Sequence, residues 1–552
     1  MSIKGNTDTL TNTVTNSSTT SDDDLETALD SRLSSESSST SSSPNTTINK
    51  INDISPISTG TTTPSLLPSI VNEFLGEIND DHLNQQSDLL LHDFNEALQE
   101  NSKITMLPNY NINPSGNEFG QFLVIDLGGS TLRIAIIKID KPTDHDEADR
   151  SKRIHILNEK SWIIENNFKT IDNNFFKFIA SKIAEIIKDD EEFSNCHIIK
   201  TGISWSFPLK TTNYNNGKIV HVSKGYTISD EIYNKDLKTI LESVLKSEFN
   251  LLIDVKIILN DSLAVYAAGS FMDKFMKLAL VLGTGTNMCC SLNKKDSDLM
   301  HDDKKLGTQD KVLFNTELSL FGQSIIKQFT NKYDGLIDSR FNQVIDLHFK
   351  TFMTVDPISK TIFQPLELTT SGRYLPELTR LVLCDLINAK EIFTRLSCQD
   401  LAHILHASYD GITGKLICFI NETEDLQDIK LKLHEIYQWD IDLITTNDIL
   451  NLKTIIETIL TRGAFIISIS VIAFIKLIQL HNPEEFQSLL DQKVINIGYV
   501  GSVLHHFNHY RHLIKQFIND NTEIKQFGLK VDFKLIENSS VIGPAIGAAY
   551  YS

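Results

Sequence analysis

The sequence has no excess of basic residues, no secretory signal and no apolar run long enough to cross a bilayer. Its formal net charge is −20, which argues against binding nucleic acid through phosphates, because that requires a basic face. The N-terminus, MSIKGNTDTL, is polar. The most apolar stretch, residues 464–475, is typical of a buried helix. These absences predict a cytoplasmic protein with no nucleic-acid partner and no membrane span.

Cysteine is also scarce. The spacing of the six cysteines matches no metal motif, and two of them are adjacent in a predicted strand. We therefore expect free, buried thiols in a reducing compartment. The cysteines are Cys196, Cys289, Cys290, Cys384, Cys398 and Cys418.

Large apolar side chains are rare in residues 1–65, which consist mainly of Ser, Thr, Asn and Asp. Such a segment cannot bury enough surface to offset its chain entropy, so we predict a disordered tail. The remainder is too long for a single core and should form two domains or lobes. An apolar fraction of 41% with 22% charged residues is typical of a globular protein.

Apolar periodicity predicts alternating strands and helices, and hence an α/β fold. Helical spacing covers much of residues 65–101, and Asp172 is a candidate N-cap. The charged stretch 294–311 is expected to be an exposed loop, and the chain from there to about Lys493 to be mainly helical. Two strands near the C-terminus are each followed by a Gly/Ser turn and a helix of small residues.

Two strand–turn–strand segments carry the strongest chemical signal. The first, LVIDLGGSTLRIAIIKI (residues 123–139), has an aspartate before paired glycines; the second is LALVLGTGTNMCC (residues 278–290). Glycine turns let backbone N–H groups approach an anionic ligand closely. Two such hairpins in one chain indicate two related halves that grip one polyphosphate, as in a nucleotide-dependent phosphotransferase.

The order of these and further segments resembles the hexokinase family from about residue 101 to the C-terminus. The similar segments are MLPNYNINPSGNEFGQFLVIDLGGSTLR, GISWSFP, VSKGY, ILNDSLAVYAAG, VLGTGTNMC, NTELSLFG, QPLELTTSGRYLPELTRLVL, IGYVGSVL and ENSSVIGPAIGAA. The resemblance implies a two-lobed actin-like ATPase (ribonuclease H-like) fold. Residues 66–270 would form mostly the small lobe and residues 271–552 mostly the large lobe.

The resemblance also implies the active-site residues, with ATP and Mg²⁺ as cofactors. Asp261 would be the general base for the 6-hydroxyl of the sugar, assisted by Lys224, although Asn-Asp-Ser could also simply cap the following helix. Asp126 would hold Mg²⁺ through water. The sugar-binding residues would be Ser206, Ser223, Lys224, Asn260, Asp261, Asn287, Glu317 and Glu367. The nucleotide-binding residues would be Asp126, Gly128, Gly129, Ser130, Thr131, Arg133, Gly283, Thr284, Gly285, Thr286, Gly501 and Ser502.

Arg133 has a second interpretation, a structural ion pair. The sequence departs from the common family pattern at several positions, and two of these departures bear on specificity. Glu-Trp-Gly becomes Glu317-Leu318-Ser319, and loss of the ring would make room for a 2-acetamido group. Residues 539–542 read Ser-Ser-Val-Ile where Gly-Ser-Gly-Lys is usual, which alters the adenosine contacts.

Within the family, the segments KSWII, SWSFPL, HVSKGYT, ELSLFGQ and LIENSS are more similar to fungal N-acetylglucosamine kinases than to glucose hexokinases. The resemblance therefore favours an N-acetylglucosamine 6-kinase. Two alternatives stay open: a kinase for glucose or a related hexose, and a sugar-sensing protein without turnover. The oligomeric state is not determined by the sequence.

Overall fold

The computed structural model describes residues 65–143, 149–190, 193, 196–207, 209–220, 222, 226–295, 297–343, 363–409 and 411–552. The predicted disordered tail lies almost entirely outside the described residues. The chain divides into the units Met1–Pro64 and Ser65–Ser552, and the second unit carries all the structure that follows.

A five-stranded sheet has the order β10-β6-β2-β3-β4, with β2, β6 and β10 parallel and the β2–β3 and β3–β4 pairs antiparallel. Alternate residues of β2 lie in different cores. Leu123 and Ile125 share a core with α5 (Asn173–Lys188) and α7 (Leu237–Phe249), whereas Phe122 and Val124 share a core with α8 (Asp261–Met272) and α20 (Ser539–Tyr550). The sheet is therefore covered on both faces. Its strands are β2 (Gly120–Leu127), β3 (Thr131–Ile139), β4 (Ile154–Ile163), β6 (Ile199–Trp205) and β10 (Ile253–Leu259).

A six-stranded sheet has the order β1-β13-β12-β11-β14-β15. The pairs among β1, β13, β12 and β11 are antiparallel, and β11, β14 and β15 are parallel. Without β1, this sheet repeats the order and directions of the first, with β11 in the place of β2. The repeat supports the two related halves that the paired hairpins indicated. The strands are β1 (Leu107–Asn109), β11 (Met276–Leu282), β12 (Thr286–Asn293), β13 (Lys311–Asn315), β14 (Val494–Val500) and β15 (Lys530–Leu535).

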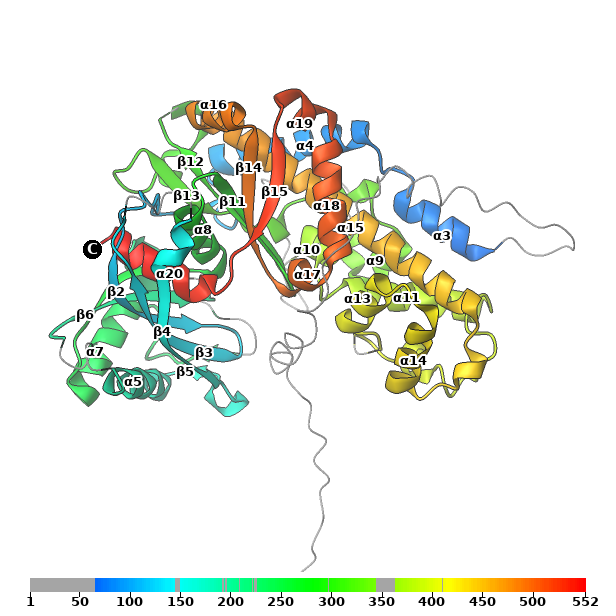
Figure 1. The fold of residues 1–552 in the computed structure, drawn as a ribbon, viewed down its shortest axis with the longest axis horizontal. Helices are drawn as coiled ribbons and strands as arrows, with labels where there is room; N and C mark the ends of the chain where they lie inside the picture. The colour runs from blue at the N-terminus through cyan, green and yellow to red at the C-terminus, as the bar shows by residue number, and fades with distance from the viewer. Residues whose placement is uncertain are drawn as a thin grey trace, which may run out of the picture. The chain divides into compact units, whose positions relative to one another are not determined.

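Two helices, α8 (Asp261–Met272) and α20 (Ser539–Tyr550), pack against each other between the two sheets (Figure 1). Their backbones approach each other closely at one point. A Cβ atom on Gly543 would lie 2.2 Å from the carbonyl oxygen of Ala264, and one on Gly202 of β6 would lie 2.3 Å from that of Pro544. Glycine is therefore required where α20 meets α8 and β6. This contact holds the end of β10, where α8 begins, in a fixed position between the halves.

The remaining helices cover the outer faces. The helices α5 (Asn173–Lys188) and α7 (Leu237–Phe249) pack on the five-stranded sheet, and Asp172 caps α5 as predicted, accepting the Phe175 N–H at 2.8 Å. The rest belong to the six-stranded half: α3 (Leu66–Leu75), α4 (Asp80–Gln99), α9 (Lys332–Ile337), α10 (Pro365–Thr370), α11 (Leu375–Asn388), α12 (Ala402–Leu405), α13 (Gly414–Glu422), α14 (Leu426–Tyr437), α15 (Thr446–His481), α16 (Pro483–Gln492), α17 (Ser502–His506), α18 (Asn508–Asp520) and α19 (Thr522–Phe527). Two short pairs, β5 (Thr170–Ile171) with β9 (Thr227–Ile228) and β7 (Leu209–Asn213) with β8 (Asn216–Ile219), complete the described strands.

The apolar stretch 464–475 lies within α15, a helix of 36 residues. By length and composition α15 could cross a membrane. The sequence expectation that no apolar run is long enough to cross a bilayer is therefore wrong. However, 89% of its most apolar 18-residue window is buried inside the protein. The helix packs against α3, α4, α11 and α18, which makes it the central helix of the larger core.

Two sequence expectations need correction. The stretch 294–311 is not simply exposed, because Lys304 is buried and its ammonium group donates to the carbonyl oxygens of Ser102, Thr105 and Met106. All six cysteines are free as expected, but Cys196 and Cys398 are exposed.

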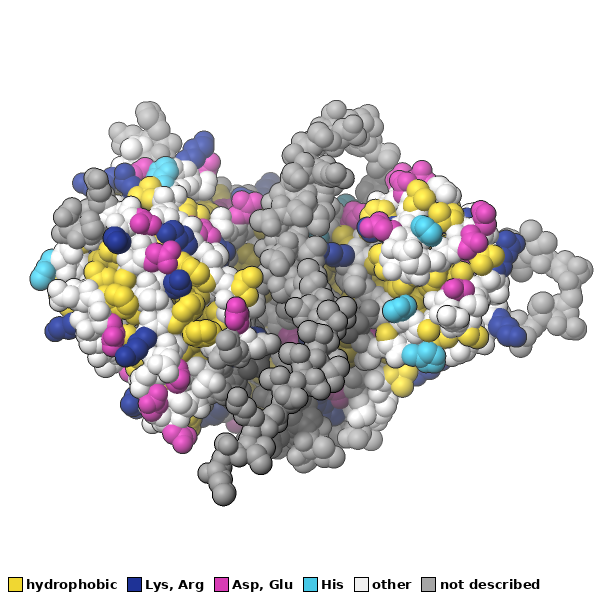
Figure 2. Space-filling view, turned by 90° about the horizontal axis from the view of Figure 1, so that it is seen from below, with side chains coloured by type: hydrophobic (Ala, Val, Ile, Leu, Met, Phe, Trp, Pro, Cys, Tyr) yellow, Lys and Arg dark blue, Asp and Glu magenta, His cyan; other side chains and the backbone are white. Residues whose placement is uncertain are grey.

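On the face seen in Figure 2, acidic and basic side chains are interspersed over the described surface.

Candidate active site

The first glycine hairpin joins β2 to β3. The Gly128 N–H donates to the Thr131 carbonyl oxygen at 2.9 Å and closes the turn, so this amide is used within the protein. Gly129 and Ser130 occupy the tip of the turn, between the end of β2 and the start of β3. The carbonyl oxygen of Ser130 accepts the Ile164 N–H at 2.7 Å, which fixes the turn against the end of β4.

The second glycine hairpin joins β11 to β12 and is closed by the Gly283 N–H, which donates to the Gly285 carbonyl oxygen at 3.0 Å. Thr284 is exposed at its tip. The Thr286 N–H donates to Glu367 Oε2 at 3.2 Å, and a Cβ atom on Gly285 would lie 2.7 Å from the same oxygen. A side chain at position 285 would displace the Glu367 carboxylate, so the hairpin and the predicted sugar-binding glutamate are adjacent.

The turn after β14 lies against the second hairpin. Gly501 has a φ of +108°, and a Cβ atom there would lie 2.4 Å from the Leu282 carbonyl oxygen. A Cβ atom on Gly283 would lie 3.3 Å from the Ser502 backbone nitrogen. The predicted nucleotide residues Gly283, Gly501 and Ser502 are therefore brought together by backbone contact.

Asp261 is the first residue of α8, and its Oδ1 accepts the Ser262 N–H at 2.7 Å. The N-cap is Asn260, whose side chain accepts the Leu263 N–H at 3.0 Å. The capping role that the sequence left open thus belongs to Asn260, and Asp261 lies exposed beside it.

Two carboxyl groups, the buried Asp126 and the half-buried Glu317, lie within electrostatic range of Asp261. Burial, with a contribution from the Asp261 charge, raises the pKa of Asp126, while the hydroxyls of Ser540 and Ser204 and the Arg133 guanidinium oppose this rise. Burial raises the pKa of Glu317 to about 7; its bond with Asn315 lowers that pKa, and the charges of Asp261 and Glu367 raise it further. The site therefore concentrates negative charge with little solvent, as a site for cations or sugar hydroxyls requires.

A chain of amide side chains positions Glu317. The Asn287 side-chain N–H donates to Asn315 Oδ1 at 2.8 Å, and the Asn315 side-chain N–H donates to Glu317 Oε1 at 2.8 Å. Glu317 itself has a left-handed backbone, with a φ of 52°. The Leu318 N–H then donates to Asn287 Oδ1 at 3.2 Å, so Asn287 holds both sides of the glutamate.

Asn315 was missed by the sequence analysis. Its signal was the segment NTELS, in which an amide stands two residues before Glu317. Arg373 was missed as well. It is exposed directly after Gly372, whose N–H donates to the Gly283 carbonyl oxygen at 2.7 Å. The Arg373 guanidinium carbon lies 5.5 Å from the centre of the Tyr409 ring, so an oriented cation lies beside the second hairpin.

The sugar loop is only partly described. The Ser206 N–H donates to the Leu127 carbonyl oxygen at 3.1 Å, which places Ser206 next to the end of β2 and near Asp126. Ser223 and Lys224 lie outside the described residues. Arg133 pairs with Glu159 at 3.1 Å and donates to Asn538 Oδ1 at 3.3 Å, so it makes structural contacts, and its nucleotide-binding role stays a prediction.

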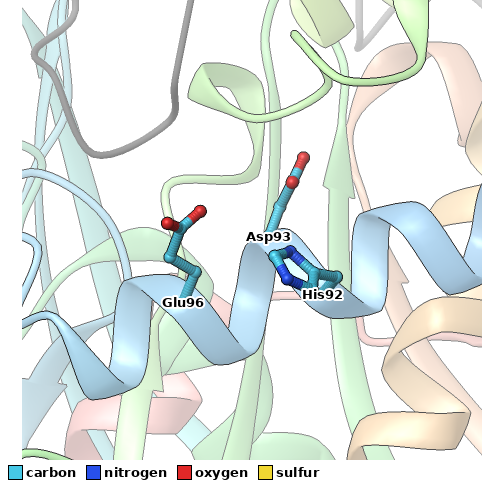
Figure 3. Close-up of side chains that lie close together, drawn as sticks. All are labelled: His92, Asp93 and Glu96. Atoms are coloured by element: carbon cyan, nitrogen blue, oxygen red, sulfur yellow. The ribbon is translucent and has the colours of Figure 1, made fainter.

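Among the described residues, one group of side chains could hold a metal ion by geometry, namely His92, Asp93 and Glu96 on α4 (Figure 3). Their ligand atoms lie within 4.8 Å of one another. Asp93 accepts a hydrogen bond from the Ser324 hydroxyl, and burial raises its pKa to about 6. Asp93 thus joins α4 to the segment that holds Ser324, and nothing further points to a bound ion at this group.

Comparison with known proteins assigns the family. Sequence profiles described as hexokinase match residues 69–271 and 277–550. N-acetylglucosamine kinase 1 of Candida albicans is 54% identical over 487 residues, which cover 88% of this chain and 94% of that protein. The chain belongs to the hexokinase family. It is thus a phosphotransferase of the sugar kinase type, as the sequence motifs predicted.

More distant relatives support the same assignment. Hexokinase-2 of Solanum tuberosum is 23% identical over 85% of this chain and 87% of its own length. The hexokinase of Schistosoma mansoni complexed with glucose matches the structure with a TM-score of 0.65 at 19% identity, covering 88% of this chain and 98% of that one. This likeness confirms the predicted two-lobed α/β hexokinase fold.

Proposed function

We propose that this protein transfers the γ-phosphoryl group of ATP to the 6-hydroxyl group of N-acetylglucosamine. The observation that carries the proposal is the 54% identity to an N-acetylglucosamine kinase over nearly the full length of both chains. The site agrees with a sugar substrate, because carboxylates and amides converge near Asp261 and can pair with a ring of hydroxyl groups.

Asp261 is the general base in this proposal. It stands at the start of α8, and its backbone is fixed by the contact between α8 and α20. One carboxylate oxygen accepts the Ser262 N–H, which leaves the other to accept the proton of the 6-hydroxyl group as the phosphoryl group is transferred. Lys224 would assist at the same end of the sugar, as the family resemblance implies.

The sugar lies between the segments that carry Glu317 and Glu367. Each glutamate can accept hydrogen bonds from two adjacent hydroxyl groups, and Asn287 and Asn315 keep Glu317 in one orientation. Ser206 and Asn260 lie at the ends of the neighbouring strands β6 and β10, and Ser223 would complete the set.

ATP lies across the two glycine hairpins. Gly129, Ser130 and Thr131 approach its phosphates from one half, and Gly283, Thr284, Gly285 and Thr286 from the other, with Gly501 and Ser502 toward the adenosine. Arg373 adds a positive charge beside the second hairpin. The two parts, residues 66–270 and 271–552, each supply one hairpin, although residues 66–109 pack with the second part, because β1 pairs with β13.

Mg²⁺ fits beside Asp126. The burial and the neighbouring Asp261 charge that raise the Asp126 pKa would both be offset by a divalent cation, and Mg²⁺ prefers oxygen ligands. When bound, the ion neutralises charge on the phosphates. Asp126 would hold it through water, with the hydroxyl of Ser540 orienting the carboxylate.

A coupled assay of ADP release tests the proposal. The purified full chain with ATP and Mg²⁺ is offered N-acetylglucosamine, glucose, fructose and mannose in turn. We expect the highest kcat/KM for N-acetylglucosamine. Preference for glucose would instead favour a general hexokinase, and absence of ADP with every sugar would favour a sensing protein.

A further inference from the structure

The two segments that carry the proposed sugar-binding glutamates are joined by a hydrogen bond between side chains. The Gln364 side-chain N–H donates to the Ser319 hydroxyl oxygen at 3.1 Å. Ser319 lies two residues after Glu317 in the short 3₁₀ helix Leu318–Leu320, and only 3% of its surface is exposed. Gln364 is the N-cap residue of α10, whose third residue is Glu367. The bonded pair is therefore adjacent to both glutamates.

The hydrogen-bonding capacity of the nearby amides distinguishes Gln364. Asn287 donates to Asn315 and accepts the Leu318 N–H, and Asn315 donates to Glu317 in turn, so both ends of each are used. Asn260 has its oxygen engaged as the cap of α8. Gln364 Oε1, by contrast, accepts no hydrogen bond from any residue that the structure describes, while its nitrogen is held by Ser319. The half-buried Gln364 thus offers an oriented acceptor next to the glutamates.

Leu318 does not offer a hydrogen-bond acceptor to the sugar. Its side chain is fully buried in the large core with Phe321 and Leu366, so the change from the family's Trp at this position alters the core beneath the site. The other departure from the family's Glu-Trp-Gly segment is Ser319. It introduces a polar contact, because its hydroxyl oxygen accepts a hydrogen bond from the Gln364 side chain.

We propose that Gln364 Oε1 accepts the amide N–H of the 2-acetamido group of the sugar, and that Ser319 is the positioning residue that holds the Gln364 amide in this orientation. This inference rests on the proposed function and names the side chain that recognises the 2-acetamido group of the proposed substrate. An amide N–H can only donate, so it requires an acceptor. A glutamine free to rotate would present its own N–H groups half of the time, and two donors facing each other leave both unpaired.

The test compares two ligands that differ in one group: N-acetylglucosamine and its analogue in which a methylene group replaces the amide N–H. Their dissociation constants are measured by calorimetry on the full chain. The wild type should bind N-acetylglucosamine about tenfold more tightly, the usual effect of leaving a buried acceptor unpaired. In Gln364→Met, which keeps the length of the side chain but removes the acceptor, the ratio should fall to within about twofold. Equal binding of the two ligands by the wild type would overturn the inference.

Three further variants sharpen the result. Gln364→Glu keeps an acceptor and should keep the preference for the N–H ligand. Ser319→Ala should raise the KM for N-acetylglucosamine severalfold with little change in kcat, since only the orientation of Gln364 is lost. Gln328→Met is the matched control. Gln328 Oε1 accepts a hydrogen bond at 3.2 Å from the side chain of Gln86, which belongs to α4, so this variant should leave the ratio of the two dissociation constants unchanged. A Gln364→Met protein that keeps the full preference would refute the inference, whereas a wild type that neither binds nor phosphorylates N-acetylglucosamine would refute the proposed function itself.

Discussion

The raised pKa of Glu317 predicts a pH-dependent gain in stability for Glu317→Gln. Burial, together with the Asp261 and Glu367 charges, raises this pKa from 4.5 to about 7. Between these values the unfolded chain releases the proton and the folded chain keeps it, so the wild type loses stability as pH rises. Above the pKa of Glu317 in the folded protein, its ionisation lowers the free energy of unfolding by about 3 kcal/mol in total, since each pKa unit corresponds to roughly 1.4 kcal/mol. The glutamine side chain of the variant keeps an oxygen that can accept from Asn315, and it does not ionise.

Urea unfolding of both proteins between pH 6 and pH 8.5 provides the measurement. This range avoids precipitation near the sequence pI of about 5.2. From pH 6 to pH 8.5, the free energy of unfolding of the variant relative to the wild type should increase by about 1 kcal/mol. The rest of the total difference has already developed between the unfolded pKa and pH 6. A flat difference would refute the reasoning.

Glu485→Gln is the control for this measurement. Burial of Glu485 acts against ionisation, but the ammonium groups of Lys277 and Lys311 hold its pKa below the usual value. The stability that Glu485 contributes is present above its unfolded pKa and is lost only as pH falls through the lower folded pKa. Its removal should therefore lower stability by the same amount throughout pH 6 to 8.5.

Other predictions concern single residues. Asp261→Asn should lower kcat by about 10²- to 10⁴-fold while calorimetry still detects sugar binding; a near-normal kcat would remove Asp261 as the base. Arg373→Ala should raise the KM for ATP and not that for the sugar in steady-state kinetics. Asp334→Asn should cost about 3–5 kcal/mol in urea unfolding, because it breaks a fully buried pair with Arg462 at 2.7 Å, whereas Asp303→Asn, at an exposed pair, should cost less than about 1 kcal/mol.

The sequence predicted the features that depend on local pattern. Paired glycines between apolar strands predicted both hairpins, and Asp172 predicted the start of α5, since turns and caps are formed by neighbouring residues. Asp261 was placed correctly at the end of a strand and the start of a helix. The proposed chemical roles of these residues depend on the family resemblance and remain predictions.

Contacts between distant segments could not be predicted in this way. Gln364 and Ser319 are joined across 45 positions of the chain, and no spacing rule connects them. Lys304 was assigned to an exposed loop because its neighbours are charged, but three carbonyl oxygens near the end of α4 satisfy its ammonium group and permit burial. In each case a polar side chain has its partner in another segment.

The glycine contacts of α20 have a consequence for biosynthesis. The last strand of the five-stranded sheet ends at Leu259, yet one face of the sheet is covered by α20 (Ser539–Tyr550), which is much later in the sequence. While the ribosome adds the intervening residues, Phe122 and Val124 on that face lack their final partners. The nascent chain must therefore protect an apolar sheet face until α20 has been synthesised, and premature stop codons just before α20 should yield products that are degraded or retained by chaperones.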